Sequence, residues 1–300
     1  MRGPVRRTIG AMRFVVIAHR CNDTNSALVS AAEALGIAST VLHPRDALRI
    51  LEPGDVALGR LDVREGLDGI ESGAAEIERL SAAGVEILNR PGALVAAHDK
   101  LLTARALRLA GLPHPRTWLI AEGMPTHAPE LPIVLKPRFG SWGRDVVLCR
   151  TADELAAALE RAAFRGWFRE HGALAQELVP PLGWDLRVVV AGGRVVGAAR
   201  RIAAPGEWRT NVALGGRVEP CAPPPAARTL AISAAAAIRG DLVGVDLLPT
   251  PEQGYVVSEL NGAVDFRPAY SLDADDVYTS AVIELLRVAR DRRATALVPA

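Results

Sequence analysis

The first 90 residues alternate between short apolar runs and helix-like stretches, and this alternation limits the possible folds more than any other feature. Residues 13–18 (RFVVIA) form a continuous apolar run, and a helical pattern then continues to Leu35, where Gly36 stops it. Further strand-like runs follow at 40–42, 56–58 and 85–88, with a helical pattern over 69–83 before the last of them. Such an alternation predicts a small, mostly parallel sheet with helices on its faces.

The rest of the chain predicts two α+β units. A helical pattern over 91–109 ends where Gly111, Pro113 and Pro115 supply a flexible stop and two residues that cannot continue a helix. Further on, Gly192-Gly193 suits the positive φ angles of a tight hairpin turn between two apolar runs. The expected strands lie at 133–136, 146–149, 174–179, 185–190, 194–202, 244–248 and 255–261, and the expected helices at 152–163, up to 238, and at 275–290. We therefore predict three domains, at 13–90, 91–180 and 181–295.

The charge balance excludes a general attraction to polyanions. The chain has 35 Lys and Arg residues against 34 Asp and Glu residues, a formal net charge of +1. No global field would gather nucleic acid or an acidic membrane surface, so neither is an expected partner, and any polyanion must be held by a local site. With 49% of 300 residues hydrophobic, the chain can bury a sizeable core.

Cysteine usage and the N-terminal leader both indicate a cytoplasmic protein. The three cysteines, Cys21, Cys149 and Cys221, lack the paired spacing of a disulfide framework or a zinc site. The leader at 1–10 carries arginines but no apolar segment follows it, and no apolar run reaches the roughly 18 to 20 residues that a membrane span needs. We expect the leader to be a disordered tail, with the structured chain starting near Met12.

Three oxygen-bearing side chains near the C-terminal end predict a metal site. Asp246 lies in an apolar strand (GVDLL), and Glu259 and Asn261 lie two apart in another (YVVSELN). Residues two apart face the same side of a strand, so an antiparallel pairing would gather all three on one face, where hard oxygen ligands suit Mg²⁺. Two other interpretations stay open at this point. The residues could be solvated on an exposed face, or they could form a salt-bridge network with Arg200, Arg201 or Arg209.

A second candidate feature is Lys136, at the end of an apolar strand, with the loop 137–145 that follows it. Gly140 and Gly143 in this loop can bring backbone N–H groups against phosphate oxygens, although an ordinary hairpin loop would look the same. Neither a Walker loop nor a G-x-G-x-x-G motif after a strand occurs, so neither a P-loop NTPase nor a Rossmann dinucleotide site is supported. Six scattered histidines, with no G-x-S-x-G or H-E-x-x-H motif, leave nucleophilic catalysis without support.

Together these fragments resemble a known family. The residues that carry the resemblance are, in order, Asn89, 98–103 (HDKLLT), 110–117 (AGLPHPRT), 134–137 (VLKP), 140–144 (GSWGR), Gln176-Glu177, 185–187 (DLR), Arg200-Arg201, 208–211 (WRTN), Gly215-Gly216, 244–246 (GVD) and 259–261 (ELN). Their order and spacing over roughly residues 13–288 resemble the ATP-grasp superfamily, and within it the RimK/LysX group of amino-acid ligases. The resemblance implies an ATP-grasp fold, with an N-terminal parallel α/β domain, a central α+β lid subdomain and a C-terminal α+β subdomain. ATP would then bind between the last two.

The resemblance also implies roles for site residues. By resemblance, ATP is bound by Lys100 and Lys136 at the phosphates, Gly140, Ser141, Trp142 and Gly143 in the covering loop, Gln176 and Glu177 beside adenine, and Asp185 near the ribose. Arg209 and Asn211 match positions near the γ-phosphate and are the expected catalytic pair. The metal ligands would be Asp246, Glu259 and Asn261, holding Mg²⁺ or alternatively Mn²⁺. The expected substrate-binding cations are Arg187, Arg200 and Arg201.

The activity implied by the resemblance is an ATP-dependent carboxylate–amine ligase that works through an acyl phosphate. Lysine, arginine and a metal ion would neutralise the γ-phosphate so that a carboxylate can attack it, and an amine would then consume the acyl phosphate. The loop 140–144 is closer to LysX-type enzymes, which join glutamate or 2-aminoadipate to the C-terminal glutamate of a small acidic carrier protein. After Asn261, the run 262–267 (GAVDFR) lacks the Pro-Gly turn of the RimK pattern, yet 262–264 also differs from the more polar LysX residues.

Two alternatives stay open at the sequence level. One is a RimK-like α-L-glutamate ligase that extends the C-terminus of a ribosomal or other protein, or of a cofactor. The other, from a different class, is a non-catalytic module that binds ATP as a regulator. The resemblance further implies a homo-oligomer, either a dimer or a tetramer.

Overall fold

The N-terminal sheet is parallel throughout. In the computed structural model, which describes residues 12–121, 130–272 and 275–296, its four strands lie in the order β2-β1-β3-β4. The strands are β1 (Phe14–Ile17), β2 (Ser39–Leu42), β3 (Val56–Gly59) and β4 (Glu86–Leu88), and the helices between them are α1 (Asp23–Ala34), α2 (Pro44–Ile50) and α3 (Ala74–Ala82). Every residue of β1 and β3 is buried, as expected for central parallel strands covered on both faces. The leader expected to be a disordered tail lies outside the described residues.

The middle sheet is antiparallel, with the order β5-β8-β6-β7. Its elements are β5 (Thr117–Ile120), β6 (Ile133–Pro137), β7 (Val147–Cys149), α6 (Ala152–Ala163), α7 (Gly166–His171) and β8 (Ala173–Glu177). The two helices cover one face and bury Trp167 and Phe168 beneath them. Leu67, from the loop after β3, also belongs to this core and is only 4% exposed. A residue of the first unit therefore packs inside the second.

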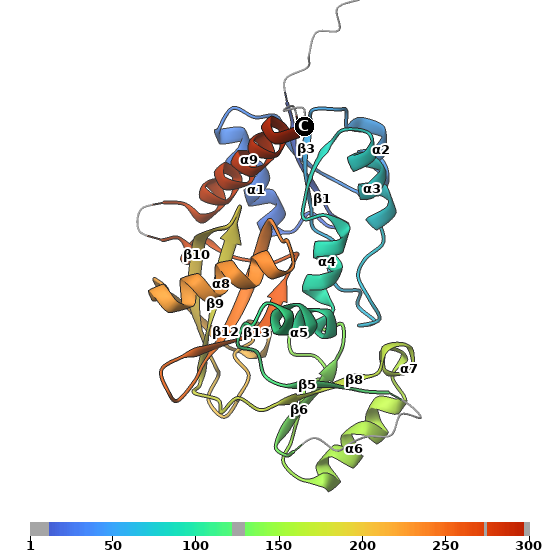
Figure 1. Ribbon diagram of the computed structural model, residues 1–300, viewed down its shortest axis with the longest axis vertical. Coiled ribbons are helices and arrows are strands. Elements are labelled where there is room, and N and C mark those ends of the chain that lie inside the picture. Colours follow the sequence, from blue (N-terminus) through green and yellow to red (C-terminus); the bar gives the residue numbers. More distant parts are fainter. Residues whose placement is uncertain (1–11, 122–129, 273–274, 297–300) are drawn as a thin grey trace, which may run out of the picture.

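The third sheet is antiparallel and has the order β11-β10-β9-β12-β13. Its strands are β9 (Trp184–Ala191), β10 (Arg194–Ile202), β11 (Arg217–Pro220), β12 (Leu242–Pro249) and β13 (Tyr255–Asn261), and two short 3-10 turns lie at Val212–Leu214 and Pro268–Tyr270. The predicted hairpin turn is found at Gly192 and Gly193, both with positive φ. Figure 1 shows this sheet between the N-terminal unit and the middle unit.

Different helices pack on the two faces of the third sheet. Helices α4 (Pro91–His98), α5 (Lys100–Leu109) and α8 (Pro225–Ala237) contribute to the apolar core on one face, together with Leu186, Val188 and Val245. On the other face, α9 (Val277–Ala296) packs against α1 and against β9 and β10, so that one apolar core joins the first and third units. The part of this face that α9 leaves uncovered carries polar side chains, which form the candidate site.

The helix predicted over 91–109 is two helices. Asp99 between them has extended backbone angles, φ −83° and ψ 98°, and its carboxylate caps α5 by accepting from the N–H groups of Leu101 and Leu102. The same carboxylate accepts from Arg138, which follows β6, and Lys100 N donates to the Arg138 carbonyl at 3.1 Å. The break therefore ties α5 to the start of the loop 137–145. In the part of the chain that the structure describes, no helix combines the length and apolar character required to cross a membrane.

Candidate functional site

Strands β12 and β13 bring Asp246, Glu259 and Asn261 to one face of the third sheet. The strands pair antiparallel, with Asp246 opposite Glu259 and Gly244 opposite Asn261. The register shifts between Asp246 and Leu247, which leaves Ser258 as the extra residue of a bulge. Ser258 and Glu259 consequently both line the same cavity. The pairing expected from the two sequence runs is thus found, with the bulge as an addition.

Asp246 lies at the centre of a buried ionic network. Nε and Nη2 of Arg187 each donate to one of its oxygens at 2.8 Å, and Nη2 of Arg201 donates to Oδ2 at 2.9 Å. Arg201 also forms a two-pronged pair with Asp185, which accepts a further hydrogen bond from Thr210. Burial acts to raise the pKa of Asp246, but Arg187 and Arg201 outweigh it and hold the pKa well below its usual range. Asp246 is therefore a carboxylate anion.

The structure does not bring Arg200 to this network. Its neighbour in the β10–β9 pairing is Leu186, a residue of the opposite, apolar face, whereas Arg201 pairs with Asp185. The Arg200 guanidinium lies over the ring of Trp184, 4.5 Å from its centroid. Adjacent strand residues face opposite sides, so Arg200 and Arg201 cannot bind the same substrate group.

Two lysines enter the site from the middle unit and from α5. Nζ of Lys100 donates to Glu259 Oε1 at 2.8 Å and to the Gly140 carbonyl at 2.7 Å. Nζ of Lys136 donates to Gln176 Oε1 at 2.7 Å. Burial, followed by the positive charge of Lys100, lowers the pKa of Lys136 to about 8. Two cations this close to one another favour an anion between or beside them.

A cavity lies between the middle and third sheets, and the residues expected to bind nucleotide line it. It opens onto about 1050 Å³ of empty space. Apolar side chains of Val134, Val146, Leu178 and Leu248 contribute to its walls. Its polar lining includes Lys100, Lys136, the loop 140–143, Gln176, Glu177, Asp185, Arg201, Arg209, Asn211, Asp246 and Glu259. Apolar walls with a few charged groups are typical of small-molecule sites.

Several of these side chains are already engaged within the protein. Besides accepting from Lys136, Gln176 donates to the Thr117 hydroxyl at 2.9 Å, and Glu177 pairs with Arg116 on the surface. Both oxygens of Asp185 accept from Arg201 or Thr210. The expected adenine and ribose contacts would therefore come from backbone groups of 176–179 or require these side chains to exchange partners.

Arg209 and Asn211 link the third unit to the covering loop. Arg209 forms a two-pronged pair with Glu207, which lowers the Glu207 pKa to about 2, and its Nη1 donates to the Gly143 carbonyl at 3.1 Å. Gly143 has φ +71°, and a Cβ there would lie 2.9 Å from Oδ1 of Asn211. Glycine at this position thus meets both a conformational and a steric requirement.

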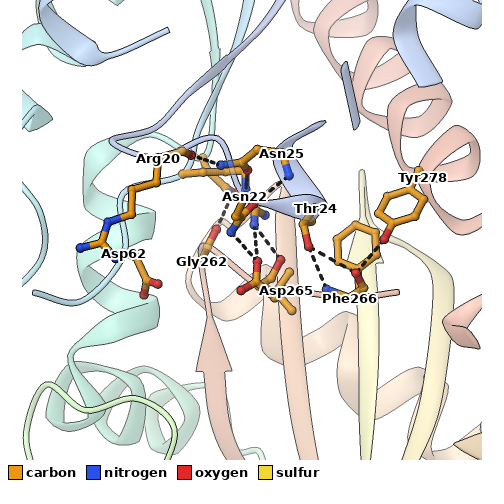
Figure 2. A network of polar contacts seen from close by, with 12 residues as sticks. Arg20, Asn22, Thr24, Asn25, Asp62, Gly262, Asp265, Phe266 and Tyr278 are labelled. Carbon is orange, nitrogen blue, oxygen red and sulfur yellow. Dashed lines mark hydrogen bonds and ion pairs between the residues drawn. The ribbon is translucent and has the colours of Figure 1, made fainter. Parts of the chain in front are cut away.

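A second cavity adjoins the first and shares five of its lining residues, Ser141, Trp142, Arg201, Asn211 and Glu259. Its far wall comes from the N-terminal unit, where the loops after β1 and β3 meet the turn that follows β13 (Figure 2). Asn22 donates to Asp265 at 2.9 Å, and the Tyr278 hydroxyl donates to the Phe266 carbonyl at 2.7 Å. In parallel sheets, ligands bind outside the carboxyl ends of the strands, which is the position of this wall.

The second cavity includes polar residues to which sequence reasoning gave no role. These are Asn22, Asp23, Thr24, Asp62, His98, Asp265 and Arg267. A signal existed for Asp62, because it follows a buried strand of a parallel sheet, where binding residues gather. His98 stood inside the resemblance motif without an assigned role.

The residues present fit a divalent cation bound to a nucleotide. Among the described residues, no three His, Cys, Asp or Glu side chains are grouped to hold a metal, so a cation here needs the amide of Asn261 besides two carboxylates. Asn261 offers such an amide oxygen, Oδ1. Its Nδ2 is a donor that is buried and, within the ranges described, has no hydrogen-bond partner, so it can face an anion such as phosphate. Two carboxylates and an amide are the hard oxygen donors that Mg²⁺ takes, with phosphate and water completing its shell.

Comparison with known proteins gives one matching family model and many relatives. A model described as a RimK-like ATP-grasp domain matches residues 97–275. The glutamate–LysW ligase ArgX of Sulfurisphaera tokodaii is 32% identical over 192 residues, which are 63% of this chain and 68% of the relative. A probable alpha-L-glutamate ligase of Pseudomonas aeruginosa is 32% identical over 213 residues, 68% of either chain. The crystal structure of D-alanine–D-alanine ligase from Bacillus anthracis has a TM-score of 0.71 at 15% identity and covers 95% of this chain and 100% of that one.

Proposed function

The chain belongs to the RimK-like ATP-grasp family, and from this premise we propose that it joins glutamate or 2-aminoadipate, through the amino group, to the C-terminal glutamate of a small acidic carrier protein. As a family member it is an amino-acid ligase that forms amide bonds. The proposal concerns which amine and which carboxylate it joins. Support for it comes from the resemblance of the loop 140–144 to LysX-type enzymes and from the similarity to a glutamate–LysW ligase.

The single observation that carries the proposal is the shared wall of the two cavities. The first cavity holds Lys100 and Lys136, which suit a triphosphate, and the second opens toward arginines that suit carboxylates. Glu259 and Asn211 line both cavities, so the last phosphate of a nucleotide and the carboxylate of an acceptor can meet there. Ligation by this route requires such a meeting point.

The chemistry follows two displacement steps. A carboxylate oxygen of the carrier attacks the γ-phosphorus, the bond from that phosphorus to the bridging oxygen breaks, and ADP leaves. The amine nitrogen then attacks the carbonyl carbon of the acyl phosphate, phosphate leaves, and the nitrogen loses a proton. Lys100, Lys136 and Arg209 lie where they can offset the negative charge of the phosphates. Mg²⁺ held by Asp246, Glu259 and Asn261 would supply further charge neutralisation when it is bound.

The choice of an acidic amino acid rests on charge in the second cavity. Three arginines, Arg187, Arg201 and Arg267, line it together with four carboxylates, those of Asp23, Asp62, Glu259 and Asp265. Arg187 and Arg201 are already paired with carboxylates of the protein, whereas Arg267 is exposed and can meet a ligand directly. A dicarboxylic amino acid matches this distribution better than a neutral one.

A second candidate is an α-L-glutamate ligase that extends the C-terminus of a ribosomal or other protein, or of a cofactor. The similarity to the Pseudomonas aeruginosa ligase favours it. A non-catalytic nucleotide-binding module is not favoured, because the lysines and carboxylates expected in a ligase are all present around the cavities. The dimer or tetramer implied by the resemblance stays a prediction.

The proposal is tested by ADP release in the presence of Mg²⁺, ATP, one amine and one peptide. The amines are L-glutamate, 2-aminoadipate, L-aspartate and L-lysine, and the peptides are acidic carrier-like sequences ending in Glu or in Gln. We expect ADP release only with glutamate or 2-aminoadipate as the amine. If the side-chain carboxylate of the peptide's last residue is the one activated, ADP release should also require the peptide that ends in Glu. Mass spectrometry of the peptide should show a gain equal to the mass of the amino acid less one water. The proposal is rejected if ADP is released without an acidic amino acid, or if no combination of amine and peptide releases ADP.

A further inference from the structure

One wall of the second cavity carries a buried nitrogen that the ATP chemistry does not use. His98 is the last residue of α4, is 5% exposed and lines this cavity. Its Nε2 is buried and has no hydrogen-bond partner among the described residues. Buried polar atoms in proteins almost always have a partner, so an open one at a cavity wall points to a ligand.

The state of the ring tells which kind of partner Nε2 needs. Burial first, and then the charge of Lys100, lower the pKa of His98 to about 3, so the imidazole is neutral. The ring donates a hydrogen bond to the Leu61 carbonyl, which involves the other nitrogen, Nδ1. A neutral imidazole has one donor and one acceptor nitrogen. Nε2 is therefore an acceptor, and its missing partner is an N–H or O–H group.

Residue 262, a glycine, packs directly against Nε2. A Cβ on Gly262 would lie 3.3 Å from Nε2. It would also lie 3.1 Å from Leu94 and 3.3 Å from Ala97, closer than ordinary van der Waals contact. The residues on either side, Asn261 and Ala263, line the cavity. A side chain at 262 would therefore crowd the nitrogen and its neighbours in α4.

Two carboxylates share this cavity with His98, whereas the charges that act on the ring itself are those of Lys100 and Arg60. Asp62 follows Leu61, the residue that holds the His98 ring, and lines the same cavity. Asp265 lies on the same wall, where Figure 2 shows it together with Asp62 and Asn22. Positive charge from Arg187, Arg201 and Arg267 belongs to the same cavity. A ligand with an amino group and separate carboxylates matches both sets of charges.

We propose that His98 and Asp62 form the subsite for the amino group of the amine substrate. Nε2 of His98 accepts a hydrogen bond from an N–H of that group, and the Asp62 carboxylate provides the opposite charge while the amine enters as an ammonium. The subsite rests on the proposed ligase function for its biological role. It selects amines over the corresponding acids, because a ligand without the amino group leaves Nε2 unpaired and Asp62 uncompensated.

The experiment compares the binding of L-glutamate and glutarate, which differ only in the amino group, by calorimetry on the full chain with ADP and Mg²⁺ present. His98→Asn keeps a donor for the Leu61 carbonyl but has no acceptor at the position of Nε2, and His98→Gln places an amide oxygen near that position. The matched control for Asp62→Asn is Glu33→Gln, which also removes one carboxylate charge but lies on the exposed side of α1. Thermal unfolding and ADP affinity are measured for every variant.

We expect the wild type and Glu33→Gln to bind L-glutamate at least about tenfold more tightly than glutarate. His98→Asn and Asp62→Asn should lose most of this preference, His98→Gln should keep part of it, and all should bind ADP as the wild type does. The proposal is overturned by equal affinity of the wild type for both ligands, by binding of neither, by a preference that survives His98→Asn, or by a parallel loss of ADP affinity. Failure of the ADP-release panel alongside an intact, His98-dependent preference would instead reject the proposed ligase substrates and leave the subsite standing.

Discussion

Arg187 and Asp246 face each other across the pairing of β9 and β12, and two N–H groups of the guanidinium each reach one carboxylate oxygen at 2.8 Å. The sequence-based expectation separated these residues into a substrate-binding arginine and a metal ligand. The structure joins them in one buried pair, to which Arg201 adds a further contact. A substrate or cation that binds here therefore has to compete with, or add to, an existing ionic network.

The network makes Asp246 a residue on which stability depends. Asp246→Asn should lower the free energy of unfolding by about 3 to 5 kcal/mol, because the buried Arg187 loses the carboxylate with which it pairs and Arg201 loses one of its two. Chemical denaturation measures this. Glu207→Gln, which breaks the half-exposed pair with Arg209, is the comparison and should cost no more than about 1 kcal/mol. If both variants lost a similar free energy of unfolding, burial of the Asp246 network would not explain its contribution to stability.

Glu259 and Asn261 should matter for turnover more than for folding. Glu259→Ala or Asn261→Ala is expected to leave the fold intact and to abolish Mg²⁺-dependent ADP formation, because each removes an oxygen donor from the expected metal site. Circular dichroism checks that the fold is intact, and an ADP-release assay measures the loss of turnover. Glu252→Ala, in the exposed turn between β12 and β13, is the control and should behave as the wild type. Undiminished turnover in both site variants would refute the assigned metal site.

Nucleotide affinity should depend on pH through Lys136. Its ammonium group binds phosphate only when protonated, and its pKa of about 8 means that the charge is lost as the pH rises through that value. The affinity of the free enzyme for ADP should therefore fall between pH 8 and the ordinary lysine range, by at most about tenfold per pH unit. Lys136→Arg keeps its charge and should flatten the profile. A falling profile in that variant would assign the pH dependence to another group.

The covering loop offers a test in which two glycines serve as a matched pair. A Cβ at Gly140 would meet no atom closer than 3.6 Å, whereas at Gly143 it would lie 2.9 Å from Asn211 and would impose a strained φ of +71°. Gly143→Ala should raise the KM for ATP about tenfold, while Gly140→Ala should change it by less than about threefold. Steady-state kinetics at saturating second substrates measure both. Equal effects would show that the loop does not depend on the local geometry at 143.

The sequence predicts the fold well where periodicity is strong. The alternation in the first 90 residues predicts the parallel sheet, and Gly192-Gly193 predicts the hairpin turn between β9 and β10 of the third sheet. The ATP-grasp fold expected from the resemblance is confirmed by the likeness to D-alanine–D-alanine ligase, and the family by the matching model. The division into domains and the roles of single site residues stay predictions.

Elements defined by tertiary pairing escaped prediction. Strand β5 has four residues and is a strand only because β8 lies beside it, and β11 is a short edge strand beside β10. The break at Asp99 depends on Arg138, 39 residues away, so the helical pattern runs across it unchanged. Helices α2 and α7 are too short for a periodic signal.

The site shows the same limit. Asp246, Glu259 and Asn261 could be placed on one face from a spacing of two, but the partners of Asp246 depend on the register of β9 against β12, which no local pattern encodes. The alternation rule does separate Arg200 from Arg201, since neighbours in a strand face opposite sides, and the resemblance alone had grouped them. His98 lacked a signal because its significance lies in an atom left without a partner.

Leu67 extends from the N-terminal unit into the apolar core of the middle unit, although the two sheets share no strand. A swing of the middle unit away from the rest of the protein would pull this side chain into water, at a cost of about 2 kcal/mol. Wide opening is therefore a roughly thirtyfold rarer event than it would be with a polar residue at this position. Replacing one leucine far from any phosphate would thus change how often the nucleotide cavity is exposed.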